Sequence, residues 1–516
     1  MASMSSAVGI DLGTTFSLIA YLDEHGKPKT IANCEGDLIT PSVVLFDGSS
    51  VVVGKEAVKA AGFEPEKVAQ FVKREMGSGG YSKVINGEQI PPEVIQSFIL
   101  EKLKRDAESV IGPIKKVVIT VPAYFNEPCR KATQDAGHLA GLDVMDIINE
   151  PTAAAIAFGM RAGFVTESGE SKRLERILVY DLGGGTFDVT MMEIDGKQYV
   201  VKATAGDVFL GGIDWDQRLA DHVAEQFMKK FQDDDPRQNA TSLQRLLREA
   251  EDAKRALTAR ESTTISFEHS GHRLQVPITR REFEKLTGDL LERTRFTTSS
   301  VLKDAGVAWN EITRLLLVGG SSRMPMVREM LERESGQKVD CSLSFDEAVA
   351  HGAAIYAGLL LASEDGAIGQ SAIKNVNAHN LGVLGIEAAT NRPRNSTIIS
   401  RNTPLPVTKR SRFSTQKADQ RNVVVKVVEG GDASGNGSTA IGKCVVRQLP
   451  PGLPARTPVD VTFTYAENGR LTVSANLPGL KQKAILSIER ESGLSDASLQ
   501  DWEQRLRNGS GPLKLK

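Results

Sequence analysis

The distribution of apolar residues divides the chain into an α/β part and a β part. Over residues 1 to about 363, continuous apolar runs bounded by charge or glycine predict buried strands at 117–121, 176–182 and 312–320. Between them, apolar residues at three- and four-residue spacing predict helices at 93–111, about 241–258 and 345–362. Strands that alternate with helices indicate an α/β fold with both sheet faces covered.

The pattern changes after residue 363. Residues 363–380 are small, polar and weakly periodic, so we expect a linker there. From 381 to about 491 the pattern is mostly strands, and the two arms of 459–477 flank Asn468-Gly469, a strong hairpin signal. Further strands are predicted at 422–431 and 483–491. Together they indicate a compact antiparallel β module.

The last predicted element is a short amphipathic helix at 494–509. Ser495 is a suitable N-cap, and one face of the helix carries Leu499, Trp502 and Leu506. A helix of about three turns cannot bury such a face alone. We therefore expect it to dock on the β module, unless its partner helices are missing.

Residues 8–23 and 178–195 share one plan. Each begins with an apolar strand, continues with Asp-Leu-Gly and a turn of small residues that ends in Thr, and finishes with a second alternating strand. The repeat predicts two hairpins at equivalent places in two duplicated lobes.

The composition is that of an ordinary globular protein. Of the 516 residues, 40% are apolar and 25% charged, which excludes a mostly disordered chain. At about 150 residues per domain, the length allows roughly three domains or two large ones. The formal net charge is −2, without the basic excess that nucleic-acid binders usually show.

Cysteine usage and hydropathy favour a cytoplasmic location. The four cysteines lie far apart without a CxxC pair, so we expect neither a disulfide framework nor a thiolate metal site, and a reducing cytosol fits. The N-terminus lacks the basic flank and apolar run of a signal peptide. No stretch of about 18 apolar residues occurs, so we expect no membrane span.

The two repeated turns carry the most informative candidate chemistry. Gly13-Thr14-Thr15 and Gly183-Gly184-Gly185-Thr186 combine backbone N–H groups that an anion can approach closely with threonine hydroxyl donors. Asp11 and Asp181 can hold a hydrated Mg²⁺, which keeps its waters and prefers few carboxylates. Facing each other across a cleft, the turns would hold a polyphosphate from both sides. Without a ligand they are a pair of tight hairpins.

Two further motifs fit a nucleotide but also have ordinary explanations. Gly319-Gly320-Ser321-Ser322-Arg323 lies between a predicted strand and a helix, which suits an adenosine or phosphate contact and equally an ordinary connecting turn. The residues of one helical stripe could hold ribose and a purine: Glu251, Lys254, Arg255 and Thr258. The same stripe could be a solvated face with an ion pair worth about a few tenths of a kcal/mol.

Three lone charged residues add little by themselves: Lys73, Glu150 and Asp188. The chain has no GxxxxGK[ST] motif, so it is not a P-loop enzyme.

Six motifs in sequence carry a resemblance to a known family: GIDLGTTFS, VPAYFN, NEPTAAAIAFG, DLGGGTFDV, VGGSSRMP and DEAVAHGAA. In this order they resemble the heat shock protein 70 (DnaK-type) chaperone family. The β module continues the resemblance to about residue 500. Single motifs also fit actin and sugar kinases, whereas all six in sequence are highly specific to the chaperones.

The resemblance implies an architecture. We expect an actin-like ATPase domain over residues 1–365, an interdomain linker over 366–378 and an antiparallel β-sandwich that binds peptides over 379–491. A short helix, the beginning of a lid, and a tail would occupy 492–516.

The resemblance also implies site residues. Those that would arrange the attacking water, Mg²⁺ and γ-phosphate are Lys73, Glu150, Asp181 and Thr186. Those that would hold the metal, mainly through water, are Asp11, Asp181 and Asp188. The implied nucleotide contacts are Asp11, Gly13, Thr14, Thr15, Phe16, Gly183, Gly184, Gly185, Gly211, Gly212, Glu251, Lys254, Arg255, Thr258, Gly319, Gly320, Ser321, Arg323 and Asp346. A proline switch and its arginine relay match Pro122 and Arg130, and the peptide pocket matches Val423, Val425 and Gln416.

The implied function is that of an ATP-dependent chaperone, in which slow ATP hydrolysis controls the binding of extended apolar peptides. The cofactors would be ATP or ADP, Mg²⁺ and K⁺, and the partners unfolded peptides, a J-domain co-chaperone and a nucleotide exchange factor. We expect no nucleic acid or membrane partner, and a monomer or weak self-association. The alternatives are an ATP-binding scaffold or co-chaperone with weak or uncoupled hydrolysis, and a sugar or acyl kinase.

Four features depart from the family pattern. Lys374 and Asn375 replace an apolar residue and an acid of the linker, so interdomain coupling is expected to be weak or differently built. At the arch of the peptide site, residues 387–400 are longer and Gln416 replaces a small residue. Ile213 stands where an acid is often found near the nucleotide. The lid helices stop after the first turns, which would make peptide release fast.

Overall fold

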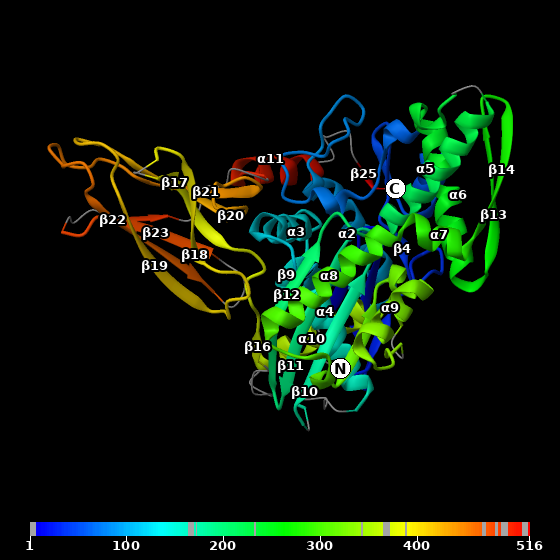
Figure 1. The fold of residues 1–516 in the computed structure, drawn as a ribbon, viewed down its shortest axis with the longest axis horizontal. Helices are drawn as coiled ribbons and strands as arrows, with labels where there is room; N and C mark the ends of the chain where they lie inside the picture. The colour runs from blue at the N-terminus through cyan, green and yellow to red at the C-terminus, as the bar shows by residue number, and fades with distance from the viewer. Residues whose placement is uncertain are drawn as a thin grey trace.

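The chain forms an α/β body with an all-β part beside it, as Figure 1 shows. This computed structural model describes residues 7–163, 170–171, 173–231, 234–341, 344–364, 372–387, 390–466, 471–479, 483–486, 494–507 and 514–515. No helix among these residues is long and apolar enough to cross a membrane.

Two sheets form the centre of the body. The first has the order β3 (Pro28–Thr30), β2 (Phe16–Leu22), β1 (Val8–Leu12), β8 (Lys116–Val121) and β9 (Asp143–Asn149), with β4 (Thr40–Pro41) also paired to β2. The second has the order β15 (Arg314–Val318), β10 (Glu175–Leu182), β11 (Phe187–Asp195), β12 (Gln198–Asp207) and β16 (Ala372–Lys374). In each sheet a hairpin, β1–β2 or β10–β11, continues into a parallel neighbour, β8 or β15. The shared pattern agrees with the predicted repeat.

Helices cover these sheets, and smaller sheets lie at the edges. The helices of the body are α1 (Lys55–Ala61), α2 (Pro92–Ile111), α3 (Glu127–Leu139), α4 (Glu150–Arg161), α5 (Gly212–Lys230), α6 (Ala240–Ala259), α7 (Arg280–Leu286), α8 (Gly288–Ala305), α9 (Pro325–Ser335) and α10 (Ala348–Glu364). A hairpin pairs β13 (Ser262–His269) with β14 (His272–Thr279), and a four-stranded sheet has the order β25 (Lys514–Leu515), β6 (Ser50–Val53), β5 (Val44–Asp47) and β7 (Val68–Ala69). The predicted helices at 93–111 and about 241–258 are confirmed as α2 and α6.

Helices α4 and α10 join the two lobes. One apolar core contains buried residues of both helices together with residues of β8, β10 and β15, so it spans the two main sheets. The helices touch so closely that a Cβ at Gly352 would overlap the backbone carbonyl of Ala153. The apolar sequence of α10 fits this position, because a helix that is apolar all round must be buried.

The all-β part consists of two four-stranded antiparallel sheets. Their orders are β18 (Pro393–Ile399), β17 (Leu381–Ile386), β20 (Val423–Gly430), β21 (Ser438–Val446), and β19 (Val407–Ser414), β22 (Pro458–Tyr465), β23 (Leu471–Asn476), β24 (Lys483–Leu486). Alternate residues of both sheets enter a single apolar core, which includes Val427 and Phe463. The predicted hairpin at 459–477 is confirmed by the β22–β23 ladder, although its turn lies outside the described residues.

The described residues of the predicted linker include a strand. Residues 372–374 form β16, which runs parallel to β12 and extends the second main sheet. Backbone pairing therefore holds this segment, which explains how polar residues such as Lys374 are accepted where apolar burial was expected.

The C-terminal helix α11 (Asp496–Arg507) corrects one prediction. Ser495 caps it as predicted, because its hydroxyl accepts from the Ser498 N–H at 3.1 Å. However, among the described residues the helix packs on α3 of the body rather than on the β module, and its Trp502 is buried in the apolar core beside the first main sheet. Arg505 reinforces the contact through an ion pair with Glu88 at 2.9 Å. Docking on the β module was therefore wrong.

Candidate functional site

The two repeated turns meet face to face. A Cβ at Gly184 would overlap the Thr15 side chain, and a Cβ at Gly185 would overlap Thr14. Only glycine lets the second turn approach the threonines of the first so closely. The hairpins of the two lobes thus bring their backbone N–H groups and hydroxyls to one place, as the repeat predicted.

Next to the turns lies a cluster of acids with one buried ammonium group; Glu150, Asp181 and Asp188 are buried, and Asp11 is partly buried. Lys73, from the turn Val72–Glu75, forms an ion pair with Glu150 at 2.5 Å, and both side chains are less than 10% exposed. Burial and the nearby Glu150 raise the pKa of Asp11 to about 7. The same two causes raise the pKa of Asp188 to about 8 and that of Asp181 well above its usual range.

The donor set of this cluster fits a divalent cation. Four acids share one lysine, so negative charge is in excess among side chains that are mostly buried, and a buried charge needs a partner. Carboxylates are the ligands that Mg²⁺ prefers, usually through its retained waters. The residues that could hold Mg²⁺ are Asp11, Asp181 and Asp188, as expected from the sequence.

Thr186 lies at the end of the second turn, where β11 begins. Its carbonyl accepts from the Gly183 N–H at 3.0 Å, which closes the turn, and its side chain is only slightly exposed at the floor of the cleft. The turn thus fixes the backbone that carries the Thr186 hydroxyl, and a hydroxyl at this position can orient a water molecule or a phosphate oxygen.

The third glycine turn lies against the acidic cluster. Gly319 has φ of +80°, and a Cβ there would overlap the Asp181 carboxylate. Ser322 bridges the turn and β10, because its hydroxyl accepts from the Leu182 N–H at 3.2 Å and donates to Val318. The turn that could have been an ordinary connection therefore forms one wall of the site.

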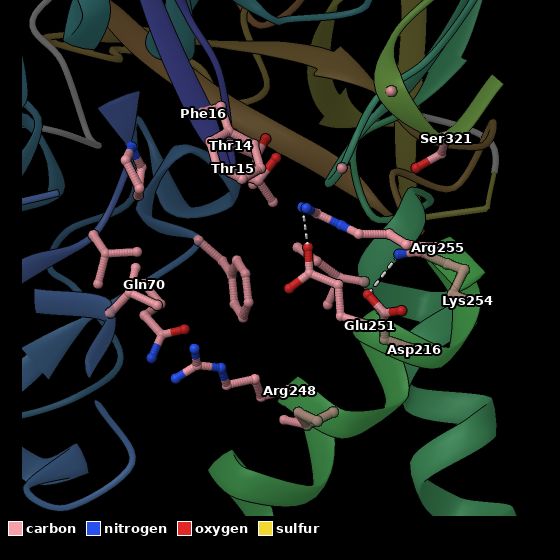
Figure 2. Close-up of a pocket in the computed structure, with 18 of the residues that line it drawn as sticks. Thr14, Thr15, Phe16, Gln70, Asp216, Arg248, Glu251, Lys254, Arg255 and Ser321 are labelled. Carbon is pink, nitrogen blue, oxygen red and sulfur yellow. Dashed lines mark hydrogen bonds and ion pairs between the residues drawn. The ribbon is translucent and has the colours of Figure 1, made fainter. Parts of the chain in front are cut away.

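The predicted helical stripe on α6 faces the same cleft (Figure 2). Lys254 donates to Asp216 at 2.7 Å and to the Gly212 carbonyl at 3.0 Å, while Arg255 pairs with Glu251 at 2.6 Å. The Arg255 guanidinium lies 5.6 Å from the Phe16 ring, so the two lobes approach each other here. The flat guanidinium and the Glu251 carboxylate suit a purine and a ribose.

Arg323 and Asp346 complete this side of the cleft. They form an ion pair at 2.7 Å with both side chains partly exposed. The Arg323 guanidinium carbon lies 5.1 Å from the centroid of the Phe345 ring, within the range of a cation–π contact. A second planar cation therefore lines the cleft, in addition to Arg255.

A single cleft of about 1070 Å³ contains most of the predicted nucleotide contacts. The predicted residues that line it are Asp11, Gly13, Thr14, Thr15, Phe16, Lys73, Glu150, Asp181, Gly183, Gly184, Thr186, Glu251, Lys254, Arg255, Thr258, Gly319, Gly320, Ser321, Arg323 and Asp346. Ile213 lines it as well, so the position that departs from the family pattern faces the cleft. Those that do not line it are Gly185, Gly211, Gly212 and Asp188.

The residues that do not line the cleft pack against residues that do. Gly211 and Gly212 pack on the second turn and on Ser321, where no Cβ fits. Asp188 accepts from the Tyr124 N–H at 2.9 Å and adds its charge to the acidic cluster.

Sequence reasoning missed two residues that shape the second turn. Arg74 donates to the Gly185 carbonyl at 2.8 Å and forms an ion pair with Asp214 at 2.6 Å. Asp214 in turn accepts from the Gly211 N–H at 2.7 Å. The position of Arg74 directly after Lys73 was the available signal, but its partners lie more than 100 residues away.

Contacts connect the acidic cluster to the β part. Tyr124, which donates to Asp188, accepts at its carbonyl from Nε2 of His379 at 2.8 Å. Arg130, the expected relay, donates to the Phe125 carbonyl at 3.2 Å and to the amide oxygen of Asn149 beside Glu150. Pro122 lies in the same segment, where its carbonyl accepts from Phe125.

The residues expected to form the peptide pocket lie in the β part. Val423 and Val425 are buried on the inner face of β20, and Gln416 is exposed in the loop before that strand. These three residues are therefore near one another along the chain, with the valines on the core side and the glutamine on the surface.

A comparison with protein families agrees with this arrangement. The family model described as Hsp70 protein matches residues 7–86 and 80–508, nearly the whole chain. Members of that family are ATP-dependent chaperones that bind nucleotide with Mg²⁺ and interact with unfolded peptides and co-chaperones. The family match, the two main sheets with one hairpin plan and the shared cleft lead to the same conclusion: the chain belongs to the Hsp70 family.

Proposed function

We propose that this chain is an ATP-hydrolysing chaperone whose nucleotide state controls the binding of extended apolar peptides by its β part. The observation that carries the proposal is the meeting of Thr14 and Thr15 with Gly184 and Gly185 next to the acidic cluster. Such a place suits a polyphosphate, because donors from both lobes converge on it.

Phosphoryl transfer needs positioning and charge stabilisation more than covalent chemistry. Lys73, fixed by Glu150, would place positive charge beside the phosphates, and Thr186 would orient the attacking water. Bound Mg²⁺ would neutralise phosphate charge, held through water by Asp11 and Asp181. We assign K⁺ to the same acidic region, beside Asp188.

The nucleoside would lie between α6 and the third glycine turn. Glu251 and Lys254 would hold the ribose, and the planar guanidinium groups of Arg255 and Arg323 would stack on the purine. Thr258, Ser321 and Asp346, which are also expected nucleotide contacts, line the same cleft.

The β part, whose two sheets we propose form a sandwich, would bind the peptide at its surface, with a pocket at Val423. Nucleotide could influence this pocket through the Asp188, Tyr124 and His379 contacts and through β16. A J-domain co-chaperone and a nucleotide exchange factor are the proposed protein partners, in the cytoplasm.

Single-turnover ATP hydrolysis with and without an apolar peptide tests the proposal. We expect slow hydrolysis that the peptide accelerates, and weaker peptide binding in ATP than in ADP. The absence of hydrolysis would contradict the enzymatic proposal. Hydrolysis without any peptide effect would favour an ATP-binding scaffold, the second candidate, which the polar linker residues Lys374 and Asn375 support.

A further inference from the structure

The nearly neutral chain conceals a strong separation of charge. Residues 379–491 contain sixteen Lys and Arg residues and eight Asp and Glu residues, a net charge of +8. The rest of the chain therefore carries −10, since the whole chain has −2. An uneven distribution of this size points to an interaction that charge controls.

Part of the positive charge gathers on two neighbouring loops, residues 415–422 and 447–457. Backbone hydrogen bonds join the loops, from Thr415 to Thr457 at 2.9 Å and from Asp419 to Leu453 at 2.7 Å. The exposed basic side chains on these loops are Lys417, Arg421, Arg447 and Arg456. We call the two loops together the basic loop pair. The loops contain a single acid, Asp419.

The charge of the basic loop pair is little neutralised. Arg421 lies 3.7 Å from Asp419, but both side chains are 57% exposed, so this pair is weak. Lys417, Arg447 and Arg456 have no ion pair within the part of the chain that the structure describes.

These loops lie away from the contact between the β part and the acidic α/β body. That contact uses the other end of the β17–β20 ladder, where Leu381 pairs with Glu429 and Glu429 accepts from the Glu127 N–H at 3.2 Å. Val423, the first residue of strand β20, lies six residues from Glu429, which corresponds to about 20 Å along the strand. The basic loop pair therefore remains available to a ligand.

The loop pair instead adjoins the proposed peptide pocket. Gln416 belongs to the first loop, and Val423 follows that loop directly. A peptide whose apolar centre enters this pocket would extend its flanking residues past the basic side chains. Acidic flanks would gain attraction there and basic flanks would meet repulsion.

We propose that the β part selects extended peptides in which an apolar centre is flanked by aspartate or glutamate. The inference rests on the proposed peptide-binding function and names its substrate class. A peptide suits the surface better than single-stranded nucleic acid, because neither loop has an aromatic residue on which bases could stack.

Peptides with one apolar centre and flanks of aspartate, serine or lysine test the proposal. Their affinities for the full chain with ADP can be measured by fluorescence anisotropy at low and high salt. We expect the aspartate-flanked peptide to bind about tenfold more tightly than the lysine-flanked one at low salt, and this ratio to approach one near 1 M salt, where the Debye length is about 3 Å.

Charge reversal locates the effect. The variant K417E/R421E/R447E/R456E should invert the order of the peptides. The matched control K229E/R281E/K285E/K338E changes the net charge equally through exposed residues of the body and should preserve the order. If the reversed variant does not fold, the neutral variant K417Q/R456Q should reduce the ratio by at least half.

The outcomes separate this inference from the function on which it rests. Equal affinities for the three peptides, together with weaker binding in ATP, would overturn the charge preference and leave the proposed function standing. Binding of none of them would overturn both. Displacement of the aspartate-flanked peptide by a single-stranded oligonucleotide at lower concentration than by the unlabelled peptide would overturn the assignment of an acidic peptide.

Discussion

The Thr186 hydroxyl is one of few groups at the floor of the cleft that can donate to an oxygen without adding charge. We expect Thr186→Ala to slow single-turnover ATP hydrolysis at least about tenfold, a loss of roughly 1.4 kcal/mol of transition-state stabilisation. ATP affinity should change little, because the backbone donors of both turns remain. Rapid mixing with labelled ATP measures the rate.

Thr186→Ser is the matched control, since it retains the hydroxyl and should keep most of the activity. An unchanged rate in the alanine variant would show that another group orients the water.

Val423 and Val424 are neighbours with opposite orientations on β20. Val423 is 9% exposed and faces the core side, whereas Val424 is 51% exposed. We expect Val423→Phe to abolish peptide binding, because the larger ring would fill the proposed pocket. Val424→Phe should leave affinity unchanged. Calorimetric titration of a peptide into both variants, after a melting curve for each, checks this. Equal affinities would place the pocket elsewhere.

The sequence identified the residues that line the site more easily than the residues that hold them in place. Twin turns led by Asp11 and Asp181 were visible because both lie within short repeated segments. The contacts of Arg74 with Gly185 and Asp214 join residues 111 and 140 positions apart. Such pairing depends on how the lobes pack, which local pattern does not determine.

At the scale of elements, α11 shows the same limit. Its apolar face predicted that the helix must dock, and Ser495 correctly predicted where it begins. The apolar face does not specify a partner, however, because burial is non-directional. The helix packs on α3 and forms an ion pair with Glu88, both of which lie more than 350 residues earlier in the chain.

Trp502 anchors this helix. We expect Trp502→Ala to lower the free energy of local opening by about 3 kcal/mol and to accelerate amide hydrogen exchange of residues 496–507 more than tenfold. Gln500→Ala, at an exposed position of the same helix, is the control and should change little. Uniform protection in both variants would show that other contacts hold the helix.

At the scale of the whole molecule, the predicted α/β and β parts were found, but their contact was not foreseen. The contact between the two parts is made by polar residues that belong to no recognisable sequence motif. One example is the ion pair between Arg401 and Asp304 at 2.7 Å. Backbone pairing of β16 also attaches the second part to the first. Neither feature has a periodic signature.

Glu429 makes this contact sensitive to pH. Burial raises its pKa from 4.5 to about 7, opposed by its hydrogen bond from Glu127 and the charge of Arg130. The carboxyl thus binds a proton more tightly in the contact than in water, and docking takes up a proton. Docking should therefore weaken as pH rises from about 4.5 to 7 and stay weakened above that.

Glu429→Gln tests this prediction, because glutamine can accept the same hydrogen bond without charge. We expect the variant to dock more strongly than the parent chain at pH 8 and equally at pH 5, measured by energy transfer between dyes on the two parts. His379 titrates in the opposite sense, since burial lowers its pKa, so the difference between the two proteins is the informative quantity. An identical pH profile would exclude Glu429 as the titrating group.

The way in which Tyr124 connects the two parts has a consequence for how its position can vary in evolution. Its main-chain N–H reaches Asp188 and its main-chain carbonyl reaches His379. Both hydrogen bonds use main-chain atoms of residue 124, so proline, which lacks the N–H, is the substitution that would remove one of them directly. The Tyr124 ring also packs on the His379 ring, with the centroids 4.1 Å apart, so a change to another aromatic residue can preserve the whole bridge, and an analysis of correlated changes between homologues would overlook its main-chain part.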